Sequence, residues 1–239
     1  MDDAFMTELA QAMATHSPLP RFPSGITVEQ AYAGQPAVSR KVGPTAGYKA
    51  GITNELIQRK LGLDQPLLGH LYRSGEQPGG AVLAHRPHAA IECELGIIVD
   101  AQGQPCWIVP ALEFVHLRFT APEDVSAANL VLCNLGADQF MLGQPQPWLS
   151  GLEALMESST IRLFRDNQLI QQACALSSMN GPEEAGEWML DQIQNHQWPV
   201  TEGTLLMTGT CGDAIPFQPG SYRADYGPLG QIEFSIAPV

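Results

Sequence analysis

Nineteen prolines and 23 glycines are spread along the 239 residues of the chain rather than gathered in one segment. Residues of these two types end helices and strands and occupy tight turns. Their distribution therefore favours many short elements, and it fits strands joined by turns better than long helices. With 44% hydrophobic residues, the chain can bury an ordinary globular core. We expect a β-rich body.

Helical signals gather in the first third of the chain. Phe5, Leu9 and Met13 repeat at helical spacing, and residues 27–30 (TVEQ) have the form of a capping box. Residues 54–61 predict a third, short helix, which ends before a glycine. We expect a helical N-terminal region over residues 1–75.

Strand signals dominate from about residue 83 onward. The strand candidates are residues 89–99, 159–165, 168–175, 204–208, 221–225 and 230–236. A helix beginning at Pro182 interrupts the series and would cover one face of a sheet. The glycine-rich residues 74–80 are the most linker-like stretch, so we assign residues 76–239 to a β-rich catalytic domain. The predicted fold class is α+β, with a mostly antiparallel or mixed sheet.

The charge of the chain excludes some partners. Its formal net charge of −13 repels nucleic acid and anionic membrane surfaces. The first residues lack the features of a signal peptide, and no apolar run approaches the roughly 20 residues that span a bilayer. The five cysteines form no CxxC pair and predict reduced thiols. We expect a cytoplasmic protein.

Glu92 and Glu94 are the first candidates for chemistry. In a strand, residues two apart project from the same face, so these two carboxylates would lie side by side while Ile91, Cys93 and Leu95 face the other way. On a buried face, two ionised carboxylates at that distance need a cation or a shared proton. On an exposed face, the same pattern has no special meaning.

Glu113 strengthens the case for a metal site because it is the only charge in the apolar residues 108–115. A lone buried glutamate needs a partner. Three carboxylates with open positions for water would form an all-oxygen site, which suits Mg²⁺ or Mn²⁺ better than zinc.

Short motifs also lie in a specific order along the chain. They are residues 27–35 (TVEQAYAGQ), residues 47–53 (GYKAGIT), residues 69–71 (GHL), Glu92 with Glu94, residues 110–113 (PALE), Arg118 and residues 207–210 (MTGT). Together they resemble the hydratase/decarboxylase branch of the fumarylacetoacetate hydrolase superfamily, typified by 2-oxopent-4-enoate hydratase and 4-oxalocrotonate decarboxylase. The resemblance runs from about residue 27 to residue 236.

This resemblance implies a mixed β-roll core with a helical N-terminal part. It implies a homo-oligomer, or an assembly with a sister hydratase or decarboxylase, and an Mg²⁺ or Mn²⁺ ion that holds the 1-carboxylate and 2-oxygen of a substrate. The implied reaction is hydration of 2-hydroxy-2,4-dienoates (2-oxo-4-enoates) to 4-hydroxy-2-oxo acids in aromatic meta-cleavage-type catabolism. The sequence leaves decarboxylation of a 4-oxalocrotonate open.

Roles follow for several polar residues, each beside a structural alternative. Lys49 is the candidate for proton transfer, since burial beside a metal ion would lower the pKa of its ammonium group; a surface lysine is the alternative. Arg118 would grip a carboxylate or serve as a structural ion-pair partner. His70 would act as a base or satisfy a backbone carbonyl.

Substrate contacts are expected from Thr208, Gly209 and Thr210, which alternatively form a plain turn at the end of a strand, and from Asn134. The motif around Asn134 departs from the "D-N-A-S" of relatives and reads Cys-Asn-Leu-Gly over residues 133–136. His116 stands where relatives carry an acid.

These departures keep a second class of function open, a catalytically lapsed relative that serves as a binding or assembly partner. Hydrolysis of a C–C bond would need a Glu-His pair, which is missing between residues 19 and 35.

Overall fold

The computed structural model describes residues 1–149, 151–152, 156 and 159–238. Its helices are α1 (Asp3–Ala14), α2 (Val28–Val42), α3 (Glu55–Lys60), α4 (Ala127–Leu132) and α6 (Pro182–Asn195). Its strands are β1 (Thr45–Gly51), β2 (Leu67–Tyr72), β3 (Glu76–Gln77), β4 (Val82–Ala84), β5 (Ala90–Val99), β6 (Pro105–Val115), β7 (Ala137–Leu142), β8 (Gln146–Pro147), β9 (Thr160–Arg165), β10 (Gln168–Cys174), β11 (Thr204–Met207), β12 (Ile215–Pro216), β13 (Gly220–Asp225) and β14 (Gln231–Ala237).

The predicted N-terminal helices are confirmed together with the signals that start them. The Thr27 side chain accepts a hydrogen bond from the Gln30 backbone N–H, and the Gln30 side chain accepts one from the Thr27 N–H, which completes the capping box of α2. Asn54 caps α3 in the same way by accepting from the backbone N–H of Leu56. Gly62 follows α3 with a left-handed φ of +70°.

The strands form a large mixed sheet and a smaller second sheet, so the α+β prediction is confirmed. In the large sheet the order is β2-β1-β11-β5-β6-β7-β3, with β1 parallel to β11 and β5 antiparallel to both β11 and β6. In the second sheet the order is β10-β9-β13-β14-β4. Asp166 and Asn167 both have positive φ in the predicted hairpin turn between β9 and β10.

Strands β1 and β2 were not predicted, although they lie within residues 1–75. They form one end of the large sheet, where β1 pairs with β11. The N-terminal region is therefore only partly helical, because some of its backbone completes the sheet of the catalytic part. The division of the chain at residues 75 and 76 into two folding units stays a prediction.

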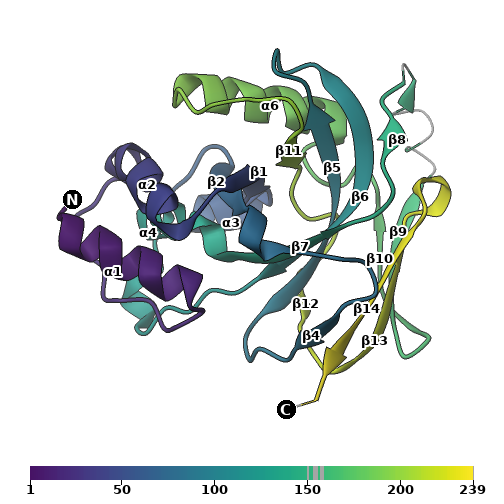
Figure 1. Ribbon diagram of the computed structural model, residues 1–239, viewed down its shortest axis with the longest axis horizontal. Coiled ribbons are helices and arrows are strands. Elements are labelled where there is room, and N and C mark those ends of the chain that lie inside the picture. Colours follow the sequence, from purple (N-terminus) through teal and green to yellow (C-terminus); the bar gives the residue numbers. More distant parts are fainter. Residues whose placement is uncertain (150, 153–155, 157–158, 239) are drawn as a thin grey trace.

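One face of β5 packs against two different parts of the molecule. Ile91, Cys93 and Leu95 are buried in the core between the two sheets, as the alternation of the sequence predicted. Further along β5, Ile97 packs with Met189 of α6. Figure 1 shows α1, α2 and α4 grouped at one end of the molecule and the second sheet at the other. Among the described residues, no helix is long and apolar enough to cross a membrane.

Candidate active site

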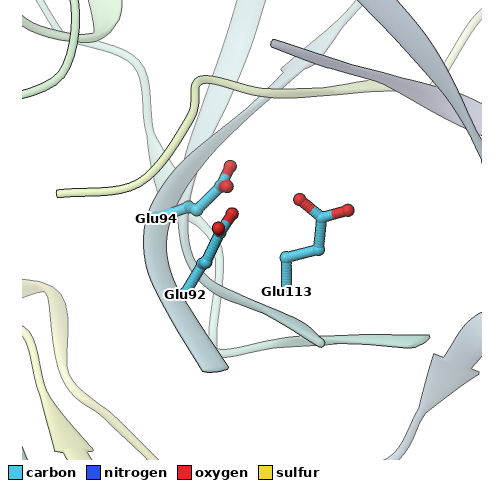
Figure 2. A group of neighbouring side chains, drawn as sticks. All are labelled: Glu92, Glu94 and Glu113. Atoms are coloured by element: carbon cyan, nitrogen blue, oxygen red, sulfur yellow. The ribbon is translucent and has the colours of Figure 1, made fainter. Parts of the chain in front are cut away.

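Glu92, Glu94 and Glu113 meet on the face of the large sheet that points away from the second sheet. Glu92 and Glu94 are two residues apart on β5 and project from one face, and Glu113 lies directly opposite Glu92 on β6. One carboxylate oxygen from each residue lies within 4.8 Å of one from each of the others. Figure 2 shows the carboxylate of Glu113 facing those of Glu92 and Glu94.

The glutamate cluster is almost closed to solvent. Glu94 and Glu113 have no exposed surface, and Glu92 is half-buried. Within the described part of the chain, Glu94 Oε1 and Glu113 Oε1 accept no hydrogen bond. Buried carboxylate oxygens without donors are costly unless a cation compensates them.

Lys49 supplies one positive charge to the cluster. Its Nζ lies 2.7 Å from Glu113 Oε2, and the lysine side chain is 2% exposed. Burial opposes the ammonium charge, but the attraction of Glu113, Glu92 and Glu94 outweighs it and raises the pKa of Lys49. The sequence predicted a lowered pKa beside a metal ion. Here the direction is reversed because three carboxylates surround the ammonium group.

The carboxylates respond to the same crowding. Burial raises the pKa of Glu92 to about 7. The Lys49 charge lowers this pKa in part, and repulsion from Glu113 raises it. Burial and the charge of Glu113 raise the pKa of Glu94 well above its ordinary value. One lysine cannot balance three ionised glutamates, so the carboxyl groups either keep a proton or bind a cation.

The loop after β11 reaches the same cluster. The Gly209 backbone N–H donates to Glu94 Oε2 at 2.9 Å, while Thr208 Oγ1 donates to the backbone oxygen of Leu95 at 2.9 Å. Thr210 is half-buried, and its hydroxyl has no hydrogen-bond partner among the described residues. The structure therefore brings Lys49 and the loop of residues 208–210 to the glutamates.

The donor set fits a hard divalent cation. It consists of carboxylate oxygens with neither thiolate nor imidazole, which is the chemistry preferred by Mg²⁺ and Mn²⁺. The uncompensated oxygens of Glu94 and Glu113 point to the same requirement.

Comparison with known proteins agrees with this site chemistry. The chain is 23% identical to a 2-keto-4-pentenoate hydratase of Burkholderia vietnamiensis, with 78% of this chain and 76% of the relative covered. It is 24% identical to 2-keto-4-pentenoate hydratase 3 of Pseudomonas putida, with 89% and 86% covered. The chain is a homologue of the 2-keto-4-pentenoate hydratases. No protein-family model matches it.

The fold agrees as well. The structure of 4-oxalocrotonate decarboxylase from Pseudomonas putida G7, complexed with magnesium and adipate, superposes with a TM-score of 0.83 at 18% identity, covering 98% of this chain and 96% of that one. The expected fumarylacetoacetate hydrolase fold is confirmed.

His70 lies apart from the glutamate cluster of this hydratase homologue. On β2 it pairs with Tyr48 of β1, whereas Lys49 pairs with Gly69, so His70 and Lys49 project from opposite faces of the sheet. The imidazole packs 4.3 Å from the Trp198 ring and 5.1 Å from Tyr48 between ring centroids.

Asn134 occupies the junction between α2 and β2. Its Oδ1 accepts from the His70 backbone N–H at 3.1 Å and from the Gln35 side chain, and its Nδ2 donates to Ser39 and Tyr72. Both the oxygen and the nitrogen of the Asn134 side-chain amide therefore have partners within the protein.

Arg118 makes its contacts beyond the end of β6. The guanidinium donates through Nε to the Ser17 backbone oxygen at 3.0 Å and lies 3.7 Å from the buried carboxylate of Asp138, which also pairs with Arg86. His116 lies nearby, and burial with the charge of Arg118 lowers its pKa to about 4. Catalytic roles for His70 and Arg118 and a substrate contact of Asn134 stay predictions.

Thr53 received no role from the sequence. Its side chain contacts Gly209, the residue that binds Glu94. The only signal that could have found it is its place as the last residue of the 47–53 motif.

Proposed function

We propose that this chain is a divalent-metal-dependent hydro-lyase that adds water to 2-hydroxy-2,4-dienoates and yields 4-hydroxy-2-oxo acids. The buried Glu92–Glu94–Glu113 cluster with Lys49 at 2.7 Å from Glu113 carries the proposal. The sequence likeness to 2-keto-4-pentenoate hydratases supports it.

The three glutamates would hold Mg²⁺ or Mn²⁺ through one carboxylate oxygen each. When bound, such an ion supplies electrophilic stabilisation of negative charge on the 2-oxygen of the substrate.

The remaining chemistry belongs to side chains of the chain. Lys49 holds a proton at Nζ within the cluster and is placed to exchange it with a substrate carbon or oxygen. The burial of Lys49, Glu94 and Glu113 limits water in the site, which strengthens each charge interaction. Thr208 and Gly209 would hold the loop of residues 208–210 against β5. The Thr210 hydroxyl, which has no partner among the described residues, would orient the substrate carboxylate.

Decarboxylation of a 4-oxalocrotonate is the second candidate. The likeness in fold to a 4-oxalocrotonate decarboxylase supports it. The two reactions would share the glutamates and Lys49 and differ in the bonds that change. Hydration adds the H and OH of water across the C4–C5 double bond, whereas decarboxylation breaks a C–C bond to release CO₂ and places a proton on the carbon left behind.

The proposal is tested by calorimetric titration of Mg²⁺ and Mn²⁺ into the wild type and Glu113→Ala, followed by loss of 2-hydroxypenta-2,4-dienoate absorbance. Metal binding that the substitution abolishes, together with consumption of the dienoate, supports the hydratase. Metal binding with CO₂ release from 4-oxalocrotonate supports the decarboxylase. A wild type that binds neither metal overturns both and leaves the lapsed relative. Glu55→Ala, an exposed glutamate on α3, is the matched control.

We further propose that the chain works in the cytoplasm as a homo-oligomer or with a sister hydratase or decarboxylase. All five cysteines, which lie in the described part of the chain, are free thiols, and this supports a reducing compartment. Light scattering with purified protein would measure the assembly.

A further inference from the structure

Ile52 follows β1 in an unusual backbone conformation. Its φ is +56°, a left-handed value that is a clear outlier for a β-branched residue. The Gln58 side chain of α3 donates to the Ile52 backbone oxygen at 2.8 Å, and Gln58 is buried. A strained residue held by a hydrogen bond from a buried side chain indicates that the position of the next residue matters. That residue is Thr53.

The Thr53 side chain lies against the loop that touches the glutamate cluster. A Cβ added at Gly209 would lie 2.5 Å from Thr53 Cγ2 and 3.3 Å from Thr53 Oγ1. Only glycine fits there, and its φ of +89° demands glycine as well. Because the Gly209 N–H donates to Glu94 Oε2 at 2.9 Å, Thr53 and the glutamate cluster both adjoin Gly209.

The Thr53 hydroxyl is also accessible. Thr53 is half-buried. On the facing loop, Thr210 has a buried hydroxyl without a partner among the described residues. Thr53, from a distant part of the sequence, and Thr210, the next residue along the loop, thus both neighbour Gly209.

We propose that Thr53 is a substrate-binding residue, whose hydroxyl donates a hydrogen bond to a carboxylate oxygen of the 2-oxo acid held beside Glu94. The inference rests on the proposed function for the identity of the ligand. It adds a contact from the β1–α3 loop to those expected from residues 208–210.

The test compares Thr53→Val, which keeps the shape and removes the hydroxyl, with Thr53→Ser, which keeps the hydroxyl. Oxalate, which carries adjacent oxygens like a 2-oxo acid and undergoes no hydration, is titrated into Mg²⁺-loaded protein. Thr160→Val, at a half-buried threonine of β9 in the second sheet, is the control.

We expect Thr53→Val to weaken oxalate binding and to raise the KM for 2-hydroxypenta-2,4-dienoate by about ten- to a hundredfold, the worth of one hydrogen bond to a charged group. Thr53→Ser should stay within about twofold of the wild type. Mg²⁺ affinity and the urea unfolding midpoint should not change.

Unchanged oxalate binding in Thr53→Val would overturn the proposal, and so would a parallel loss of Mg²⁺ affinity or a failure of Thr53→Ser to restore binding. If the wild type leaves the dienoate intact but binds oxalate in a Thr53-dependent way, the Thr53 contact stands and the hydratase proposal falls. If Thr53→Val consumes the dienoate with the same KM as the wild type, the hydratase proposal stands and the Thr53 contact falls.

Discussion

Lys49 Nζ lies 2.7 Å from Glu113 Oε2, although β11 and β5 lie between the strands that carry them. Three strand spacings of about 4.8 Å separate the backbones by about 14 Å along a flat sheet. The contact therefore requires a curled sheet whose concave face brings distant side chains together. This curvature is what turns a row of carboxylates into a closed, charged cluster.

Replacing Glu94 with glutamine should stabilise the metal-free protein while removing its metal site. Glu94 is fully buried, and Glu92 and Glu113 are close by. Glutamine keeps an acceptor for the Gly209 N–H and removes a carboxyl group whose ionisation burial and the charge of Glu113 oppose. We expect the unfolding free energy to rise by about 1 to 2 kcal/mol, because functional residues are often kept at the expense of stability. Mg²⁺ affinity should fall at least tenfold. Urea denaturation and calorimetry measure the two effects.

The control for this change is Glu55→Gln, which removes an exposed carboxylate paired with Arg59. It should change neither stability nor Mg²⁺ affinity measurably. Wild-type Mg²⁺ affinity in Glu94→Gln would remove Glu94 from the metal site.

Lys49→Met should leave metal binding intact and abolish most of the turnover. The substitution removes the ammonium group and keeps much of the apolar stem, and the three glutamates that bind the cation remain. We expect kcat to fall by about 10² to 10⁴, the usual contribution of a positioned proton donor. Lys41→Met, which removes a lysine paired with Asp3 on the helical end, is the control. Full turnover by Lys49→Met would mean that a group other than Lys49 transfers the proton.

The sequence predicted the glutamate cluster better than the strand that carries Lys49. Alternation in residues 89–99 places Glu92 and Glu94 together regardless of the rest of the fold. Residues 45–51 contain glycines that weaken any strand prediction. A Cβ at Gly47 would lie 1.9 Å from the backbone oxygen of Leu205, so this glycine permits close packing that only the tertiary structure reveals.

The orientation of His70 and the partners of Arg118 also lay beyond sequence reasoning. The face from which His70 projects depends on the pairing of β2 with β1, in which His70 lies opposite Tyr48. The ion-pair partner of Arg118 is Asp138, which lies on β7. Positive φ at Ile52 and Leu135 carries no sequence signal, because both residue types normally avoid it.

Arg118→Met should cost stability rather than substrate affinity. The guanidinium donates to the Ser17 backbone oxygen and faces Asp138, whose side chain is 2% exposed. Loss of these charge-assisted contacts should lower the unfolding free energy by about 1.5 to 3 kcal/mol, with an unchanged KM. The exposed Arg73, changed to methionine, is the control. A tenfold higher KM with wild-type stability would instead show that Arg118 binds the carboxylate of the substrate.

His70 should make the protein sensitive to mild acid. Burial lowers the pKa of His70 from 6.5 to about 4 because the imidazole lies among Tyr48 and Trp198. Between these pH values the unfolded chain binds the proton and the folded chain does not, so stability falls as the pH drops from 6.5 towards 4. The full loss is about 3 kcal/mol.

Urea denaturation of the wild type and His70→Gln between pH 7 and pH 4.5 isolates this effect, because contributions from other groups cancel in the difference. The wild type should be the more stable protein at pH 7, and its advantage should shrink steadily below pH 6.5 as the unfolded state takes up the proton. His88→Gln, at an exposed histidine, controls for the loss of an imidazole. A difference that stays constant with pH would mean that His70 titrates alike in both states, and the imidazole would then have to be open to water in the folded protein.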